Sequence, residues 1–123
     1  MRSLWALLAD AAVVLLFVLI GRSSHDEGNA LLGVAATLWP FAAALALGWL
    51  ATRAWRAPAA PVRTGLGLWA VTVIGAMALR AVSGAGTAVS FIVVTTLFLG
   101  AGLLGWRAVA SWVLSRRAGS AAR

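Results

Sequence analysis

The sequence predicts an all-α fold: an integral membrane four-helix bundle that forms a single membrane domain over residues 1–123. Three observations lead to this prediction. Hydrophobic residues make up 63% of the chain and charged residues 11%, which is far from the composition of a soluble globular domain. Four apolar segments are long enough to cross a bilayer as helices. Arginines stand at the ends of these segments, as expected where helices leave the hydrocarbon.

Each apolar segment predicts one helix. The first has the basic start and apolar middle of a signal peptide, but Asp10 lies inside it and no small-x-small cleavage site follows Ile20, so we expect a retained helix. Pro40 is expected to kink the second helix. An alanine-rich linker joins the second and third helices, and the basic C-terminal tail, residues 114–123, is expected to fray. The expected helices are 4–20, 31–52, 65–82 and 87–113.

The arginines also predict an orientation. Four spans put both termini on one side of the membrane, and that side would hold eight arginines against two on the other. We therefore expect the protein in the cell (inner or plasma) membrane, with its N- and C-termini in the cytoplasm. The eight are Arg2, Arg53, Arg56, Arg63, Arg107, Arg116, Arg117 and Arg123, and the two are Arg22 and Arg80. Tryptophans near the cytoplasmic helix ends are expected to be interfacial anchors, because an indole ring is apolar while its N–H needs a partner. These are Trp5, Trp49, Trp55, Trp69, Trp106 and Trp112.

Two segments of the chain resemble each other. Residues 41–55, FAAALALGWLATRAW, match residues 98–112, FLGAGLLGWRAVASW, at seven of fifteen positions with an offset of 57. We interpret this as an internal repeat of two tandem helical hairpins related by a pseudo-twofold axis along the membrane normal. The alternative is chance recurrence of leucine, alanine, glycine and tryptophan in apolar helices. Small residues in both copies are expected to let the second and fourth helices pack closely: Ala44, Gly48, Ala101 and Gly105.

The order of motifs along nearly the whole chain resembles a known family. The motifs are Gly21-Arg22-x-Ser24-His25-x-Glu27, Trp39-Pro40-Phe41, Gly48-Trp49, Gly75-x-Met77-x-Leu79-Arg80, Ser90-Phe91 and Leu103-Leu104-Gly105-Trp106-Arg107. This pattern is similar to that of the small bacterial and archaeal membrane proteins grouped as domain of unknown function family 3054. The resemblance implies a four-helix membrane protein, and it implies no activity.

Charged residues inside or between the helices are the candidate sites. Asp10 is costly inside a membrane, and we expect it to form an intramembrane ion pair with Arg107, which lies at a comparable depth; Arg53 is the rival partner. The loop after the first helix predicts an outer polar cluster that is solvated or holds the hairpins together. Its candidate members are Arg22, His25, Asp26, Glu27 and Arg80. The single histidine could also sense external pH.

Several classes of function lack support in the sequence. The chain has no cysteine, one histidine, and no nucleophile elbow or phosphate-binding glycine loop, so we expect no enzyme, no metal site and no cofactor. The net charge of +7 would suggest nucleic acid in a soluble protein. Here the arginines flank apolar segments and form no patch with aromatic partners, so we expect no nucleic-acid partner.

Two functions remain. The first is a structural or interaction protein: a helical bundle that contacts the lipid bilayer and pairs with itself as a homodimer or with another membrane protein. The alternative is an oligomeric proton-coupled or small-solute transporter or channel-like protein. Its path would be lined by Asp10, Thr52, Thr72 and Thr95.

Overall fold

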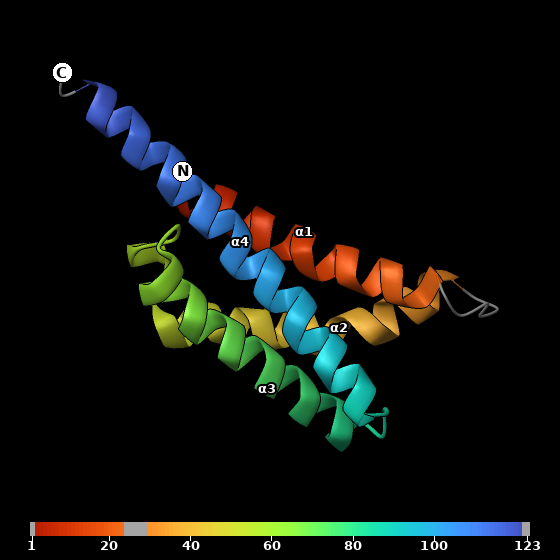
Figure 1. Cartoon of the computed structure of the whole chain (residues 1–123). Helices are drawn as coiled ribbons and strands as arrows, with labels where there is room; N and C mark the ends of the chain where they lie inside the picture. Colours follow the sequence, from red (N-terminus) through yellow and green to blue (C-terminus); the bar gives the residue numbers. More distant parts are fainter. Residues whose placement is uncertain (1, 24–29, 122–123) are drawn as a thin grey trace.

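The chain folds into four long helices joined by short connections (Figure 1), and the computed structural model describes residues 2–23 and 30–121. The helices are α1 (Arg2–Ser23), α2 (Ala30–Thr52), α3 (Leu66–Val82) and α4 (Val89–Ala121). Two short turns, η1 (Ala54–Arg56) and η2 (Pro61–Gly65), lie between α2 and α3. The described residues contain no strand, so the predicted all-α four-helix bundle is confirmed.

All four helices are long and apolar enough to cross a membrane. The candidate spans are Ser3–Gly21, Leu32–Thr52, Pro61–Val82 and Val89–Arg117. Large apolar side chains such as Leu50 and Ile74 point outward and are 66% and 69% exposed. An apolar surface of this extent would promote aggregation in water, whereas it is normal for a surface that contacts lipid. The fold is therefore that of a multi-pass membrane protein.

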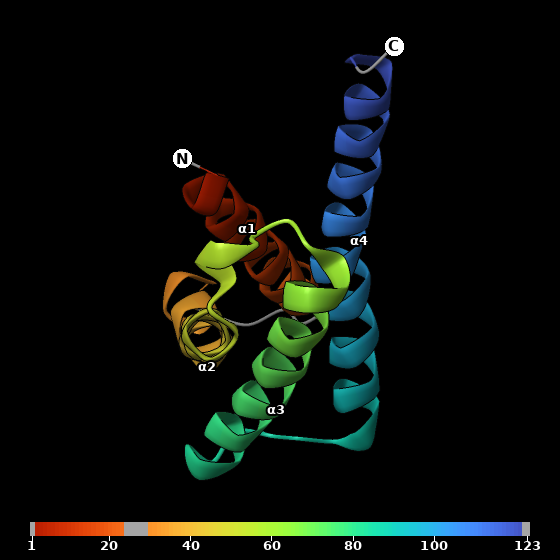
Figure 2. The ribbon, with the colours of Figure 1, turned by 90° about the vertical axis from the view of Figure 1, so that its left-hand side faces the viewer.

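The helix ends differ from those expected. α1 begins at Arg2 and ends at Ser23, so it is longer than 4–20 on both sides, and α4 continues to Ala121. The tail that was expected to fray is therefore helical as far as Ala121. Alanine, leucine and arginine favour helix, which explains why α4 runs on past its apolar part. Figure 2 shows this part of α4 extending beyond the rest of the bundle.

The segment between α2 and α3 folds back against α4. It begins at Arg53, whose φ of 51° is left-handed and turns the chain out of α2. The hydroxyl of Thr64 donates to the carbonyl of Ala57, which closes the segment on itself. From α4, Arg107 Nε donates to the Pro58 carbonyl at 2.9 Å and Ser111 Oγ donates to the Ala59 carbonyl at 3.0 Å. The linker is therefore a packed part of the bundle.

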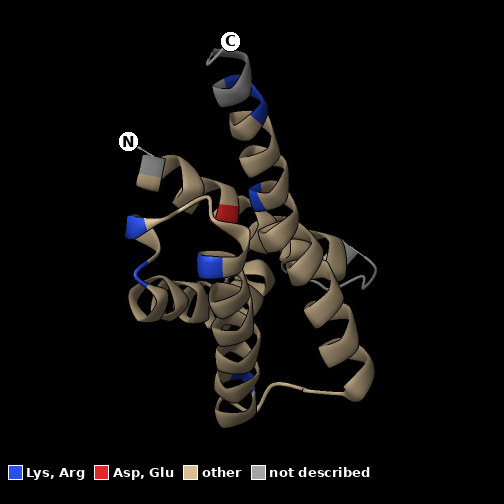
Figure 3. Ribbon diagram, turned by 60° about the vertical axis from the view of Figure 1, so that its left-hand side comes forward, with Lys and Arg blue, Asp and Glu red and all other residues tan. Residues whose placement is uncertain are grey.

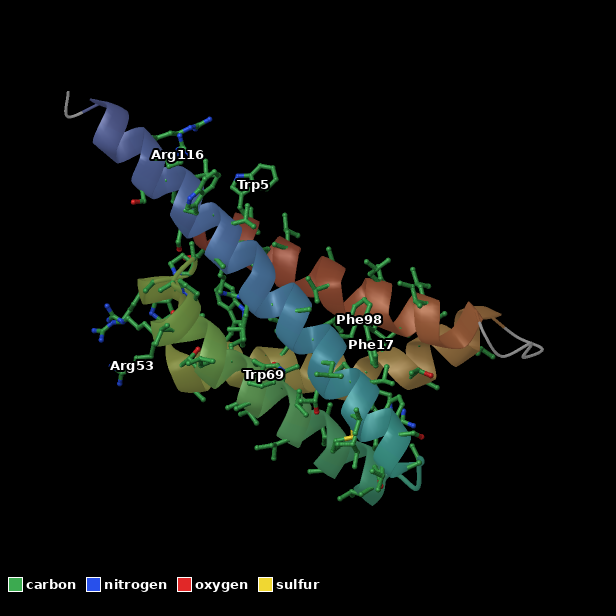
Figure 4. All side chains as sticks on the ribbon, in the orientation of Figure 1. Trp5, Phe17, Arg53, Trp69, Phe98 and Arg116 are labelled. Atoms are coloured by element: carbon green, nitrogen blue, oxygen red, sulfur yellow. The ribbon has the colours of Figure 1, made fainter. Side chains whose placement is uncertain are left out.

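Phenylalanine side chains pack together in the interior of the bundle. All four phenylalanines of the chain meet there, with Phe17 of α1 at their centre. The ring centroid of Phe17 lies 5.3 Å from those of Phe41 on α2 and Phe98 on α4, and 6.1 Å from that of Phe91. Figure 4 shows Phe17 and Phe98 pointing toward one another. α1 thus packs against α2 on one side and α4 on the other.

The small residues serve other helix pairs than we expected. α2 packs most closely on α3: a Cβ added at Gly48 would lie 2.7 Å from Leu68 Cδ1, and one at Gly75 would lie 3.1 Å from Ala44 Cβ. A Cβ added at Gly105 would meet no heavy atom within 4 Å, and Ala101 is exposed.

The prediction that Gly48 and Gly105 bring the second and fourth helices together is therefore wrong. On α4 two other glycines allow close approach. Gly102 faces Val13 of α1, and Gly100 faces the ring of Trp69 of α3. The physical reason is the position of α1, whose Phe17 touches both α2 and α4.

Candidate functional site

The most polar feature of the interior is an ion pair between Asp10 on α1 and Arg107 on α4. Both side chains are 0% exposed. Arg107 Nη1 donates to Asp10 Oδ1 and Nη2 donates to Oδ2, each at 2.7 Å. Two parallel charge-assisted bonds of this kind fix the orientation of both groups as well as attracting them. The structure thus brings together the two residues that the sequence paired.

Two tryptophans complete the surroundings of the carboxylate. Trp49 Nε1 on α2 donates to Asp10 Oδ2 at 2.8 Å, and Trp106 Nε1 on α4 donates to Oδ1 at 2.8 Å. An ionised carboxyl group offers about four acceptor positions. Two guanidinium N–H groups and two indole N–H groups occupy all of them. We call Asp10, Trp49, Trp106 and Arg107 the Asp10 clasp.

Arg107 connects the Asp10 clasp to the rest of the bundle. Besides the carboxylate, Nη1 donates to the Leu103 carbonyl at 3.0 Å, and Nε donates to the Pro58 carbonyl in the linker. The guanidinium also lies over the ring of Trp106, 4.5 Å from its centroid. A buried charge is tolerated only when its hydrogen-bonding groups are satisfied in this way. One arginine therefore ties together α1, α4 and the linker, while Trp49 adds α2.

Figure 3 shows how the charges are distributed along the bundle. The red Asp10 position lies beside a blue position on α4, and further blue positions gather at the end where the N- and C-termini lie. The linker arginines Arg53, Arg56 and Arg63 are all exposed. Arg53, the rival partner for Asp10, points away from the bundle in Figure 4. Asp10 is thus paired inside the protein, while the linker arginines face outward.

The predicted outer cluster falls mostly on residues that the structure does not describe. His25, Asp26 and Glu27 lie outside the described residues, and of Arg22 only the helical backbone is described. Arg80 Nε donates to the Gly86 carbonyl at 2.9 Å, and its guanidinium lies over the Phe91 ring, 4.4 Å from the centroid. Arg80 therefore holds the turn between α3 and α4 against the start of α4.

Only some of the predicted tryptophan anchors face outward. Trp5, Trp55 and Trp112 are exposed, as an interfacial position requires. Trp49 is buried, with only 7% of its surface exposed, and Trp106 is half-buried. Both donate to Asp10. Trp69 is also half-buried and donates to the Thr96 carbonyl at 3.0 Å. These three are therefore not simple anchors, because their N–H groups find acceptors inside the protein.

A sequence signal for the tryptophan partners was present but missed. Gly-Trp occurs at the same place in both similar segments, and Trp106 directly precedes the arginine that was assigned to Asp10. An indole N–H inside a membrane needs an acceptor. Asp10 is the only acid inside a predicted helix, so it was the natural acceptor for both tryptophans.

Two of the three threonines proposed for a transport path make ordinary hydrogen bonds within their own helices. Thr52 Oγ1 donates to the Gly48 carbonyl and Thr95 Oγ1 to the Phe91 carbonyl, each within its own helix. Thr72 Oγ1 is buried and is the one buried side-chain polar atom without a partner in the part of the chain described. Within the same residues, no three metal-ligating side chains lie together.

The chain was compared with known proteins. A family model described as "Protein of unknown function (DUF3054)" matches residues 7–110. No curated protein and no solved structure matches the chain. The matched stretch contains all four members of the Asp10 clasp and all four phenylalanines. It also covers well over half of the sequence, and the chain therefore belongs to the DUF3054 family of proteins of unknown function.

Proposed function

We propose that this protein is a structural or interaction protein of the membrane, a helical bundle that presents its outer surface to lipid and to partner helices. The observation that carries the proposal is the saturation of Asp10. All acceptor positions of its carboxylate are taken by Arg107, Trp49 and Trp106. A group that carries protons or ions must exchange its partners during each cycle, whereas a group that holds helices together need not. The surroundings of Asp10 are those of a group that holds helices together.

The proposal includes an orientation and a location. We place both termini in the cytoplasm and the protein in the cell (inner or plasma) membrane. Exposed arginines of the linker, Arg53, Arg56 and Arg63, support this orientation, because cytoplasmic loops carry an excess of arginine and lysine. The linker that carries them lies near the start of α1, because Ser3 Oγ donates to the Trp55 carbonyl at 3.4 Å.

The proposed partners are the bilayer and either a second copy of the chain or another membrane protein. Ala101 and Gly105 support a helix partner, because both face away from the rest of the bundle and small residues permit close approach. The proposal includes no enzymatic activity, no cofactor and no nucleic acid. It also includes the internal repeat: Trp49 and Trp106 match in the two similar segments, and so do Phe41 and Phe98 around Phe17.

The alternative is a proton-coupled or small-solute transporter that uses Asp10. A buried acid in a membrane helix favours it, since such residues often belong to proton pathways. In that case the ion pair with Arg107 would open during the cycle, and Asp10 would take up a proton when the guanidinium leaves. The two proposals therefore differ in whether the Asp10 clasp opens.

One experiment separates them. Wild type and Asp10→Asn are reconstituted in liposomes that contain a pH-sensitive dye, and the melting temperature of each is measured in detergent. The structural proposal expects a lower melting temperature for Asp10→Asn and equal proton flux for both proteins and for empty liposomes. Arg116→Gln is the matched control, because Arg116 is exposed and lies over Trp112 away from the Asp10 clasp. A wild-type flux that Asp10→Asn abolishes without a change in melting temperature would establish the transporter instead.

A further inference from the structure

A hollow opens at the end of the bundle where α1 begins and α4 runs out of the apolar core. Its volume is about 480 Å³, and it lies between the start of α1, the linker and α4. Its walls include Trp5 and Ala6 of α1, Pro58 of the linker, and Trp106 and Leu114 of α4. A hollow of this size is in the range of small-molecule sites, which are about 300–1,000 Å³.

One charged side chain lines this otherwise mostly apolar hollow. Arg56 belongs to its wall and is exposed, and its guanidinium makes no hydrogen bond or ion pair with the described residues. Asp10 is the one carboxylate side chain in the described ranges, and its acceptor positions are full. The charge of Arg56 is therefore available to an anion that comes from outside these residues.

The position of the hollow identifies the kind of anion. The linker lies between the spans that end at Thr52 and begin at Pro61, so it is at the depth where the hydrocarbon ends. Trp5, which is 70% exposed, is of the residue type that prefers the headgroup region. At this depth the hollow meets phosphate groups on its polar side and the upper parts of acyl chains on its apolar side. Free anions in water lack the apolar part that the walls would cover.

We propose that the hollow binds one anionic phospholipid. The phosphate pairs with the guanidinium of Arg56, and the glycerol and upper acyl chain lie between Trp5 and Trp106. Arginine suits this role because its planar donors match phosphate oxygens. The site also adjoins the Asp10 clasp: Trp106 donates to Asp10, and the Pro58 carbonyl accepts from Arg107. A bound lipid therefore covers the outer side of the clasp and stabilises it.

The test measures lipid retained by the purified full-length protein in native mass spectrometry. Phosphatidylglycerol and phosphatidylcholine with the same acyl chains are offered in turn. Wild type should retain one phosphatidylglycerol in preference to phosphatidylcholine. Arg56→Gln should weaken phosphatidylglycerol binding about tenfold, the usual effect of losing one charge-assisted hydrogen bond. Arg53→Gln is the matched control, because Arg53 is in the same linker, is exposed and does not line the hollow.

A second pair of variants tests the apolar wall. Trp5→Ala should weaken retention of both lipids, while Trp112→Ala, another exposed tryptophan of the same end, should not. The melting temperature of each variant without added lipid shows whether the fold is intact. Equal losses in Arg53→Gln and Arg56→Gln would overturn the proposal, since general surface charge would then explain the binding. Equal retention of the two lipids by wild type would overturn it as well.

Discussion

Trp49 and Trp106 donate their indole N–H groups to the two different oxygens of one carboxylate, that of Asp10, each at 2.8 Å. The two tryptophans come from α2 and α4, and they occupy matching positions in the two similar segments of the chain. α1 lies between them. The carboxylate on α1 is therefore held from both sides by equivalent residues, and Arg107 closes the arrangement with two more bonds.

The first prediction concerns the ion pair. Asp10→Leu leaves the guanidinium of Arg107 buried without its partner and should cost about 3–5 kcal/mol of stability. Asp10→Asn should cost less, because the amide oxygen can still accept a hydrogen bond. The double variant Asp10→Leu with Arg107→Leu should recover part of the loss. Thermal unfolding of wild type, Asp10→Leu, Arg107→Leu and the double variant gives the coupling energy, and a value near zero would contradict the pairing.

The second prediction concerns the two indole donors. Trp49→Phe and Trp106→Phe each leave one carboxylate acceptor position empty in a buried site, so each should cost about 1–3 kcal/mol. Trp112→Phe is the control and should change stability little, because Trp112 is exposed. Chemical unfolding monitored by circular dichroism measures all three. If Trp112→Phe were as destabilising as the other two, loss of the ring N–H at the interface would explain the effect, and the role of the donors would be disproved.

The third prediction concerns the glycines. A leucine at Gly48 would collide with Leu68, because even a Cβ there lies 2.7 Å from Leu68 Cδ1. Gly48→Leu should therefore lower stability by about 1–3 kcal/mol or more. Gly105→Leu should leave the stability of the monomer nearly unchanged, because its Cβ meets open space. Melting temperatures in detergent, with the oligomeric state checked by light scattering, provide the comparison. The reverse order of sensitivity would refute the packing of α2 on α3.

The fourth prediction concerns orientation. Reporter tags at either terminus should report the cytoplasm, and a tag inserted at Asn29 should report the opposite side, because the linker arginines favour the cytoplasmic face. Replacing Arg53, Arg56 and Arg63 together by glutamine should weaken this preference. A C-terminal tag that reports the outside would rule out the proposed orientation.

The fold class was predictable from the sequence because hydrophobic content and segment length identify membrane helices, and the order of motifs along the chain resembled that of the family. The ends of α1 and α4 were harder to place. Residues such as Ser115 and Arg116 continue a helix into water at little cost, and hydrophobicity does not report this. A prediction based on apolar length therefore ended the fourth helix at Val113, too early.

The contacts of the site were predictable where they depend on how deep a residue lies along its helix. They were not predictable where they depend on how the helix is rotated about its own axis. Asp10 and Arg107 lie at similar depths on helices in the same bundle, and each needs a partner in the hydrocarbon. Which way Gly105 and Trp49 face depends on the rotation of α4 and α2 about their axes. Helices that are apolar all round carry no polar face that reveals this rotation. Gly105 was therefore assigned to the interior and Trp49 to the surface, the reverse of what the structure shows.

The separation of Asp10 and Arg107 along the chain has a consequence for biosynthesis. A ribosome makes α1 before α4, and the two charges are 97 residues apart. Until the fourth span has entered the bilayer, the first one carries an acid whose counterion has not yet been made. The two bonds from Arg107 to Asp10 can therefore form only after the other three helices and most of α4 have been synthesised.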